Sequence, residues 1–357
     1  MPGGGFYESG GTEALRSRRA RRVAYIAAVS AVMVATAAYS MTINASGITA
    51  AEVFRSFVDQ LLPGTFDVPE RTRMIVMRVY APRVLMAVFV GGILAAGGCM
   101  VQTILKNPLA TPYTLGISSS AAFGAGMSII LGVSAAAGTA GVMLNAFLFS
   151  MVPAAVILTA TARRNISPTT LILIGVSTSY LFSAANTLMQ YFGSADAVKD
   201  AMFWAVGDLN QALLSQVPYV LVTLVVTLLC AAWLLKDINA LRMGDDTAAA
   251  LGTDVRSVRT ATILLACFST SVAVSLVGAI GFVCLLAPHI SRIFVGTDLK
   301  YLLPASAVTG SLLLVLADIV AKDLLNPVIL PVGAITAVIG APVLICMLLR
   351  GRDRSFR

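Results

Sequence analysis

The amino-acid sequence predicts an all-α polytopic membrane protein with about ten transmembrane helices. Of its 357 residues, 58% are hydrophobic and 12% are charged, whereas soluble domains average about 45–50% and about 25%. The charges lie between long apolar runs, many of which reach the length of about 20 residues that a helix needs to cross a bilayer. These observations exclude a soluble globular enzyme, a disordered tail and a coiled coil. The five cysteines lie inside apolar runs without paired spacing, which excludes a disulfide scaffold.

Ten apolar runs supply the predicted spans. In chain order they cover residues 23–42, 75–105, 115–131, 140–161, 170–192, 217–235, 260–277, 280–294, 302–321 and 329–349. The first run is too long for a signal peptide and lacks a small-residue cleavage site, so we interpret it as a retained helix. The second is longer than a bilayer requires and should tilt or protrude. Its many glycines and alanines favour either a dense bundle or a subunit interface.

Charge in the loops predicts the orientation. With ten spans, four basic clusters fall on the same side of the membrane, and the positive-inside rule makes that side cytoplasmic. The clusters are Arg16, Arg18, Arg19, Arg21 and Arg22; Arg163 and Arg164; Lys236, Arg242, Arg256 and Arg259; and Arg350, Arg352, Arg354 and Arg357. The chain then divides into a basic cytoplasmic N-terminal tail (1–22), a transmembrane domain (23–349) and a basic cytoplasmic C-terminal tail (350–357). The net charge of +8 reflects this topology and does not indicate nucleic-acid binding.

The opposite side of the membrane carries acidic residues. The loop between the fifth and sixth spans holds Asp196, Asp200 and Asp208 against one lysine. The loop after the first span is an exception to the charge pattern, because it carries three arginines although it lies outside. It also carries three acidic residues, and we interpret it as a candidate docking surface.

Several kinds of chemistry are absent from the sequence. No phosphate-binding loop of the Walker type occurs, so the chain does not hydrolyse ATP by that route. His289 is the single histidine, which excludes a zinc site built from histidines. Asp318 and Lys322 are spaced to share one face of the ninth span. They form either an ion-coupling site or a neutralising pair.

The longest cytoplasmic loop, about residues 236–259, contains a short predicted helix. Asp245 or Asp246 can cap its start, alanines follow, and Gly252 suits its end. A helix this short is unstable alone in water, so we expect it to pack against something. The alternative is an ordinary loop between spans.

From about residue 80 to residue 350, the chain resembles the FecCD-type permeases of type II ABC importers. Motifs of that family occur in order and on the predicted sides of the membrane, a combination that is highly specific. They are Ala81-Pro-Arg83, Asn107-Pro-Leu-Ala-Thr-Pro112, Leu115-Gly-Ile-Ser118, Gly244-Asp245 with Leu251-Gly252, Gly278–Arg292 including Pro288-His289, Leu302-Leu-Pro304, Leu316-Ala-Asp318, Leu330-Pro-Val-Gly333 and Ile339-Gly-Ala-Pro342.

The resemblance implies partners and an energy source. In this family two copies of a ten-helix permease form a pore, two cytoplasmic ABC ATPase subunits attach below, and a binding protein delivers substrate from outside. ATP and Mg would bind the ATPase, and this chain would bind no cofactor or metal itself. The segment from Gly244 to Gly252 matches the coupling helix that sits on the ATPase. By this match, Gly244, Asp245, Asp246, Leu251 and Gly252 contact the ATPase.

The resemblance also implies a gate and a docking surface. Asn107 and Leu109 match one element of the cytoplasmic gate, although Asn107 could instead cap its loop before Pro108. Pro168 and Thr169 match the second gate element, where the family usually has adjacent small hydroxyl residues, so Pro168 is a departure. Arg83 matches a family arginine that helps to dock the binding protein. Tyr80 and Lys322 stand where the family has two further arginines. Arg71, Arg73 and Arg78 are the candidates that could supply the docking charge instead. Pro288, His289 and Asp318 fit structural roles.

The sequence therefore predicts the permease of an ATP-driven importer in a prokaryotic cytoplasmic (inner) membrane. Within the family's range of metal chelates, a ferric siderophore is the commonest cargo, and heme or cobalamin are the alternatives. A rival hypothesis is an ion-coupled secondary transporter that uses Asp318 and Lys322.

Overall fold

The computed structural model describes residues 6–43, 47–62, 64–163, 166–325 and 328–350, and within these ranges the chain is helical and has no strand. The helices run α1 (Phe6–Ser40), α2 (Ala50–Leu61), α3 (Glu70–Ile75), η1 (Val76–Tyr80), α4 (Ala81–Ile104), η2 (Tyr113–Leu115), α5 (Ile117–Leu131), α6 (Gly138–Ser150), α7 (Val152–Arg163), α8 (Pro168–Phe192), α9 (Ala195–Val206), η3 (Leu214–Gln216), α10 (Val217–Trp233), α11 (Leu235–Met243), α12 (Asp245–Ala250), α13 (Val255–Val277), α14 (Val283–Val295), α15 (Leu299–Asp323) and α16 (Val332–Arg350).

Within the described residues, ten apolar helical segments match the ten predicted spans. Seven are long and apolar enough to cross a membrane, and the shorter ones are Ile117–Leu131, Val283–Val295 and Val332–Met347. The long second run is continuous over Glu70–Ile104, through α3, the π-turn η1 and α4. The fourth run is interrupted at Met151, between α6 and α7. Pro153 lies just beyond the break, where its missing N–H and its ring disfavour an unbroken helix.

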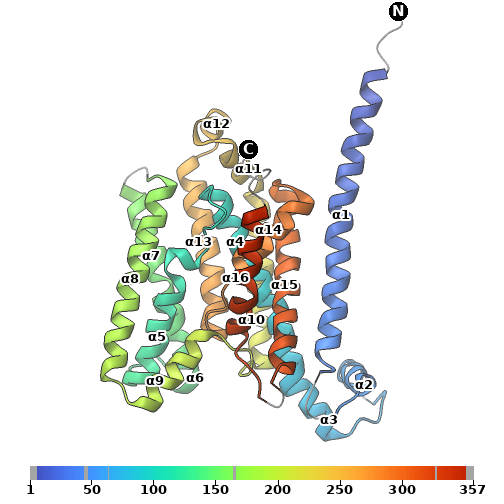
Figure 1. Ribbon diagram of the computed structural model, residues 1–357, viewed down its shortest axis with the longest axis vertical. Helices are drawn as coiled ribbons and strands as arrows, with labels where there is room; N and C mark the ends of the chain where they lie inside the picture. Colours follow the sequence, from blue (N-terminus) through green and yellow to red (C-terminus); the bar gives the residue numbers. More distant parts are fainter. Residues whose placement is uncertain (1–5, 44–46, 63, 164–165, 326–327, 351–357) are drawn as a thin grey trace, which may run out of the picture.

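Short helices mark the two ends of the helical bundle. Figure 1 shows α12 and α11 at one end of the bundle and α2, α3 and α9 at the other end. Helix α1 lies along the side of the bundle against α15 and extends beyond it (Figure 1). Tyr25 anchors α1 by stacking on Phe294 at 4.7 Å between ring centroids and by a 3.1 Å hydrogen bond to Thr309.

Helix α4 forms the centre of the bundle and is buried over nearly its whole length. It packs against α15, α13, α14 and α10. The contacts are close because glycines remove side chains at the crossings. A Cβ added at Gly91 would lie 2.5 Å from the carbonyl oxygen of Gly310, and one added at Gly98 would collide with the carbonyl of Cys284. The small residues of the second span thus serve a dense bundle within the chain.

We predict that Gly98→Ala destabilises the bundle by at least the 1–3 kcal/mol typical of overpacking. The added methyl group meets backbone of α14, which cannot rotate away as a side chain can. Thermal unfolding of the purified protein in detergent measures the effect. Gly281→Ala is the matched control, because a Cβ there has no neighbour within 4 Å. Equal melting temperatures for the two variants would contradict the close α4–α14 contact.

Candidate coupling and gating site

The predicted short helix in the longest cytoplasmic loop is α12, Asp245–Ala250. It follows Gly244, whose φ of 137° is accessible mainly to glycine. Its C-terminal end is a Schellman motif: the Gly252 N–H donates to Ala249 and the Thr253 N–H to Ala248, with Gly252 at a φ of 84°. The predicted start cap differs, because Gly244 is the N-cap residue and no side chain caps the helix.

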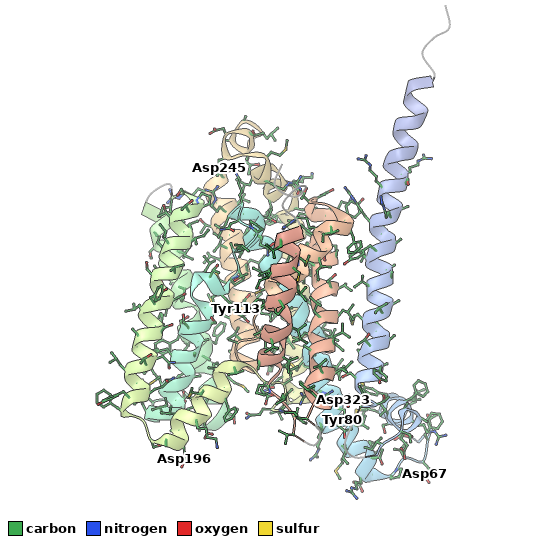
Figure 2. All side chains as sticks on the ribbon, in the orientation of Figure 1. Asp67, Tyr80, Tyr113, Asp196, Asp245 and Asp323 are labelled. Carbon is green, nitrogen blue, oxygen red and sulfur yellow. The ribbon has the colours of Figure 1, made fainter. Side chains whose placement is uncertain are left out.

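Asp245 and Asp246 face different surroundings. Asp245 turns toward the chain: Oδ1 lies 3.0 Å from Lys106 Nζ and Oδ2 lies 2.7 Å from Arg259 Nη2. Partial burial alone would raise the pKa of Asp245, but the hydrogen bonds and charges of Arg259 and Lys106 lower it below its ordinary value. Asp246 is exposed, as is Leu251 at 67%. These two residues therefore project from α12 at the end of the molecule where Figure 2 labels Asp245.

The first predicted gate element is the loop that follows α4. The Leu109 N–H donates to Asn107 Oδ1 over 2.9 Å, and the Ala110 N–H donates to the Asn107 carbonyl over 3.1 Å. Asn107 therefore does cap its loop, the alternative role that the sequence left open. This turn presents Leu109, which is 48% exposed.

The second predicted gate element begins α8. Ser167 is the N-cap residue and accepts a hydrogen bond from the Thr170 N–H, which places Pro168 in the first turn. A proline is favourable there, because backbone N–H groups of the first turn have no partner within the helix. A local structural reason thus accounts for Pro168. A cleft of about 430 Å³ brings Pro168 together with Asp245, Asp246 and Arg259. Thr169 is exposed, and neither it nor Leu109 lines this cleft.

A buried ionic cluster lies at the other end of the bundle. Asp318, fully buried, lies 2.6 Å from Arg83 Nε and 2.7 Å from Lys322 Nζ. Ser40 of α1 donates to Asp318 and accepts from Lys322, and Arg83 also donates to Asn210. The cluster joins α1, α4 and α15 to the loop after α9. Asp318 and Lys322 therefore act as the neutralising pair, extended by Arg83.

This burial corrects part of the predicted docking surface. Arg83 and Lys322 are 3% and 8% exposed, because both side chains turn inward to Asp318 and cannot present charge to a partner in this structure. Tyr80 is also buried, in a small apolar cluster with Ile48, Val53 and Val76. Arg71, Arg73 and Arg78 are exposed, and Arg73 pairs with Asp59 at 3.1 Å.

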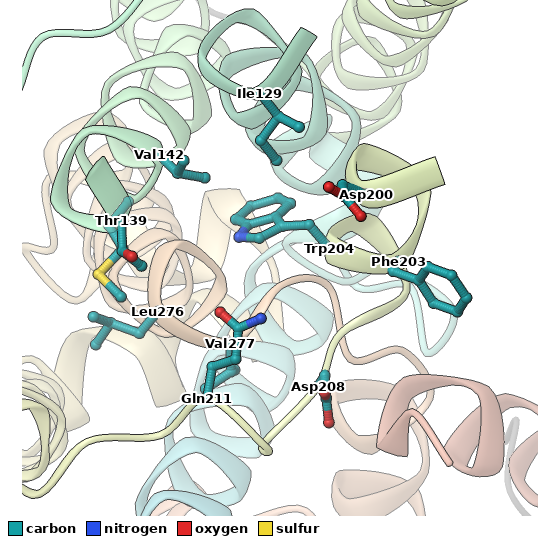
Figure 3. A pocket seen from close by; sticks show the side chains of 11 residues that line it. Ile129, Thr139, Val142, Asp200, Phe203, Trp204, Asp208, Gln211, Leu276 and Val277 are labelled. Carbon is teal, nitrogen blue, oxygen red and sulfur yellow. The ribbon is translucent and has the colours of Figure 1, made fainter. Parts of the chain in front are cut away.

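A second cavity, of about 390 Å³, opens beside α9 at the same end (Figure 3). Asp200, Trp204 and Asp208 line it. Asp208 accepts two hydrogen bonds from Asn210, which itself accepts from Arg83. The wall of the cavity is therefore tied to the buried ionic cluster. Among the described residues, no group of three or more His, Cys, Asp or Glu side chains could hold a metal ion. Pro288 is buried inside α14, beside half-buried His289.

The partners of Asp245 escaped prediction from the sequence. Lys106 directly precedes Asn107, and Arg259 belongs to a basic cluster that the sequence assigned to topology. Lys106 and Asp245 are 139 positions apart in the sequence, and a local pattern does not reveal a pairing over that distance.

Comparison with known proteins identifies the family. The sequence profile of the FecCD transport family matches residues 32–350. The chain belongs to the FecCD transport family. It is 34% identical over 284 residues to the hemin transport system permease protein HmuU of Yersinia pestis, covering 78% of this chain and 84% of HmuU. It is 32% identical to the cobalamin import system permease protein BtuC of Halobacterium salinarum, over 96% of this chain and all of that protein.

A solved structure agrees with this assignment. An inward-facing conformation of a metal-chelate type ABC transporter matches with a TM-score of 0.80 and 27% identity, over 91% of this chain and 98% of that one. The FecCD chain described here therefore has the type II ABC importer permease fold, and it is a permease subunit and not an enzyme, with ATP hydrolysis in separate subunits. Family membership also decides against the ion-coupled secondary transporter.

We predict that Asp318→Asn destabilises this FecCD permease by about 3–5 kcal/mol, since it leaves Arg83 and Lys322 buried without a compensating charge. Thermal unfolding and yield of the purified protein measure the loss. Asp323→Asn on the same helix is the matched control, because Asp323 is exposed. Similar unfolding of both variants would mean that the buried ionic cluster contributes no stability.

Proposed function

We propose that two copies of this chain form the pore of an ATP-driven importer in a prokaryotic cytoplasmic (inner) membrane. Two ABC ATPase subunits bind ATP and Mg, and one of them docks on the α12 of each copy. An extracytoplasmic binding protein delivers the substrate. The observation that carries this proposal is the exposed tip of α12. Asp246 and Leu251 are exposed there, and the helix that carries them is too short to be stable alone.

The charge distribution supports this orientation. The end that bears α12 also bears the arginines of α1, which favours a cytoplasmic location for this end and for both termini. The opposite end carries α9 with Asp196 and Asp200. Arg71 and Arg78 are the residues proposed to contact the binding protein at that end, since they are exposed and Arg83 is buried. Opposite charges at such a surface mainly speed association and orient the partners.

The substrate proposed is a metal chelate, most readily a ferric siderophore, with heme or cobalamin as the alternatives. The names of the relatives support the class: one is a hemin permease and another a cobalamin permease. The gate proposed for this cargo is formed by Leu109 with Asn107 from one loop and by Pro168 with Thr169 from the other. On a two-fold axis each copy of Leu109 would lie near its partner's.

We predict that Leu251→Glu weakens ATPase docking by at least about tenfold, because a charge replaces an apolar contact at the centre of the docking tip. Co-purification and titration of the ATPase against the permease measure the change. Leu324→Glu is the matched control: Leu324 is similarly exposed, at the opposite end of the molecule. Unchanged docking of the Leu251 variant would remove α12 from the ATPase interface.

The complete importer in proteoliposomes tests the cargo. We expect ATP-dependent uptake of a ferric siderophore presented with its binding protein, and little uptake of hemin or cobalamin. Uptake of hemin or cobalamin in preference would correct the substrate but retain the function. Uptake that persists without ATP and collapses with the proton gradient would overturn the importer itself.

A further inference from the structure

Asp245 joins three separate elements through one carboxylate. It stands on α12, one of its oxygens binds Lys106 just after α4, and the other binds Arg259 on α13. Arg259 is 7% exposed and its Nε has no hydrogen-bond partner among the described residues, so Asp245 is its main compensating group. The attachment to α13 is therefore firm, and the attachment to Lys106 leads toward the proposed gate.

Lys106 occupies a backbone position that favours glycine. The end of α4 is a Schellman motif in which the Lys106 N–H donates to Thr103 and the Asn107 N–H donates to Gln102. Lys106 is the left-handed residue of this motif, with a φ of 50°. A non-glycine residue pays about 1–2 kcal/mol there. Strained backbone positions of this kind cluster at functional sites. At this position the Lys106 side chain forms the ion pair with Asp245, which a glycine could not form.

Lys106 is rigidly connected to Leu109. Asn107 follows Lys106 directly, its side chain holds the Leu109 N–H, and its carbonyl holds the Ala110 N–H. The turn from residue 106 to residue 110 therefore moves as one unit. A displacement of Lys106 would displace Leu109 with it.

We infer that Asp245 is the positioning residue through which α12 moves the gate loop, whereas Asp246 and Leu251 meet the ATPase. The inference rests on the proposed docking of the ATPase on α12 and assigns Asp245 a different role from its neighbour. When nucleotide shifts α12, the Asp245–Lys106 ion pair carries the shift to Leu109, and Arg259 keeps the carboxylate aimed at Lys106. Both cations are needed: Arg259 holds the carboxylate in place, and Lys106 moves with it.

Crosslinking of the gate in the full complex tests this. The background is a chain with Leu109→Cys in which the exposed Cys230 and Cys346 are replaced; Cys99, Cys267 and Cys284 are buried and stay. Without other changes, nucleotide should alter the Leu109 crosslinking yield across the dimer, because ligands act by binding one conformation better. Lys106→Gln should reduce that alteration about fivefold, the effect of losing one partly exposed ion pair, while the ATPase still co-purifies and hydrolyses ATP.

Further variants separate signalling from local structure. Lys300→Gln is the matched control, because Lys300 is an exposed lysine at the same end of the molecule, and its response should stay intact. Lys106→Gly relieves the backbone strain, so a merely structural role predicts a normal response, whereas our inference predicts the same loss as in Lys106→Gln. Asp245→Asn combined with Lys106→Gln should be no worse than Asp245→Asn alone, since the two residues act in series.

The outcomes distinguish the inference from the proposed function. A normal nucleotide response in Lys106→Gln and Lys106→Gly would overturn the role of Asp245 while the importer stands. Loss of ATPase co-purification in Lys106→Gln would also overturn it, because the residue would then serve docking. If the Leu109→Cys background without a change at Lys106 or Asp245 binds the ATPase but shows no nucleotide response, the gate assignment is refuted, and the inference with it. Asp245→Asn leaves Arg259 uncompensated; if it misfolds, Lys106→Gln still decides.

Discussion

Close packing around α4 is the constraint on which the rest of the molecule depends. Lipid tails are as apolar as the side chains of the spans, so helices in a bilayer gain little from hydrophobic expulsion and are held by close contact and polar links. Gly91 and Gly98 permit this contact with α15 and α14. Asp318 also ties α15 to α4 by its ion pair with Arg83 and to α1 by a hydrogen bond from Ser40. A rigid frame results.

The proposed coupling needs movable elements on that frame, and the residues proposed for it lie at the end that bears α12. The turn around Asn107 directly follows α4, and Pro168 lies in the first turn of α8. Lys106 links α12 to the end of α4 through a partly exposed ion pair, which breaks and reforms at low cost. The Arg259 side of Asp245 is more buried and holds α12 to α13. The fully buried pairs of Asp318 are different, because separating them would expose uncompensated charge to an apolar interior. The Asp245–Lys106 pair and the Asp318 pairs thus differ in burial.

The spans were predictable because the bilayer imposes length and apolarity directly on the sequence, and the end of α12 because Gly252 is itself the structural signal. The start of α12 was assigned to an aspartate cap, whereas Gly244 is the N-cap residue. The break at Met151 was missed because a run of apolar residues conceals a kink. Asp318 and Lys322 share a helix face and were readable as a pair. Arg83, 235 residues from Asp318, was not, and its resemblance to a docking residue pointed to a surface that the fold buries. Long-range pairing is a property of packing, which local pattern does not contain.

The two aspartates at the start of α12, a helix of six residues, have different surroundings. Consecutive helical residues point about 100° apart, so Asp245 faces the bundle and Asp246 faces outward. Such a helix is unstable alone. It persists here because glycine-based turns fix both ends and Asp245 binds two cations. The helix is therefore attached to the end of α4 and to α13 through one carboxylate. Exchanging the surroundings of the two aspartates would leave Lys106 and Arg259 without the group that joins them.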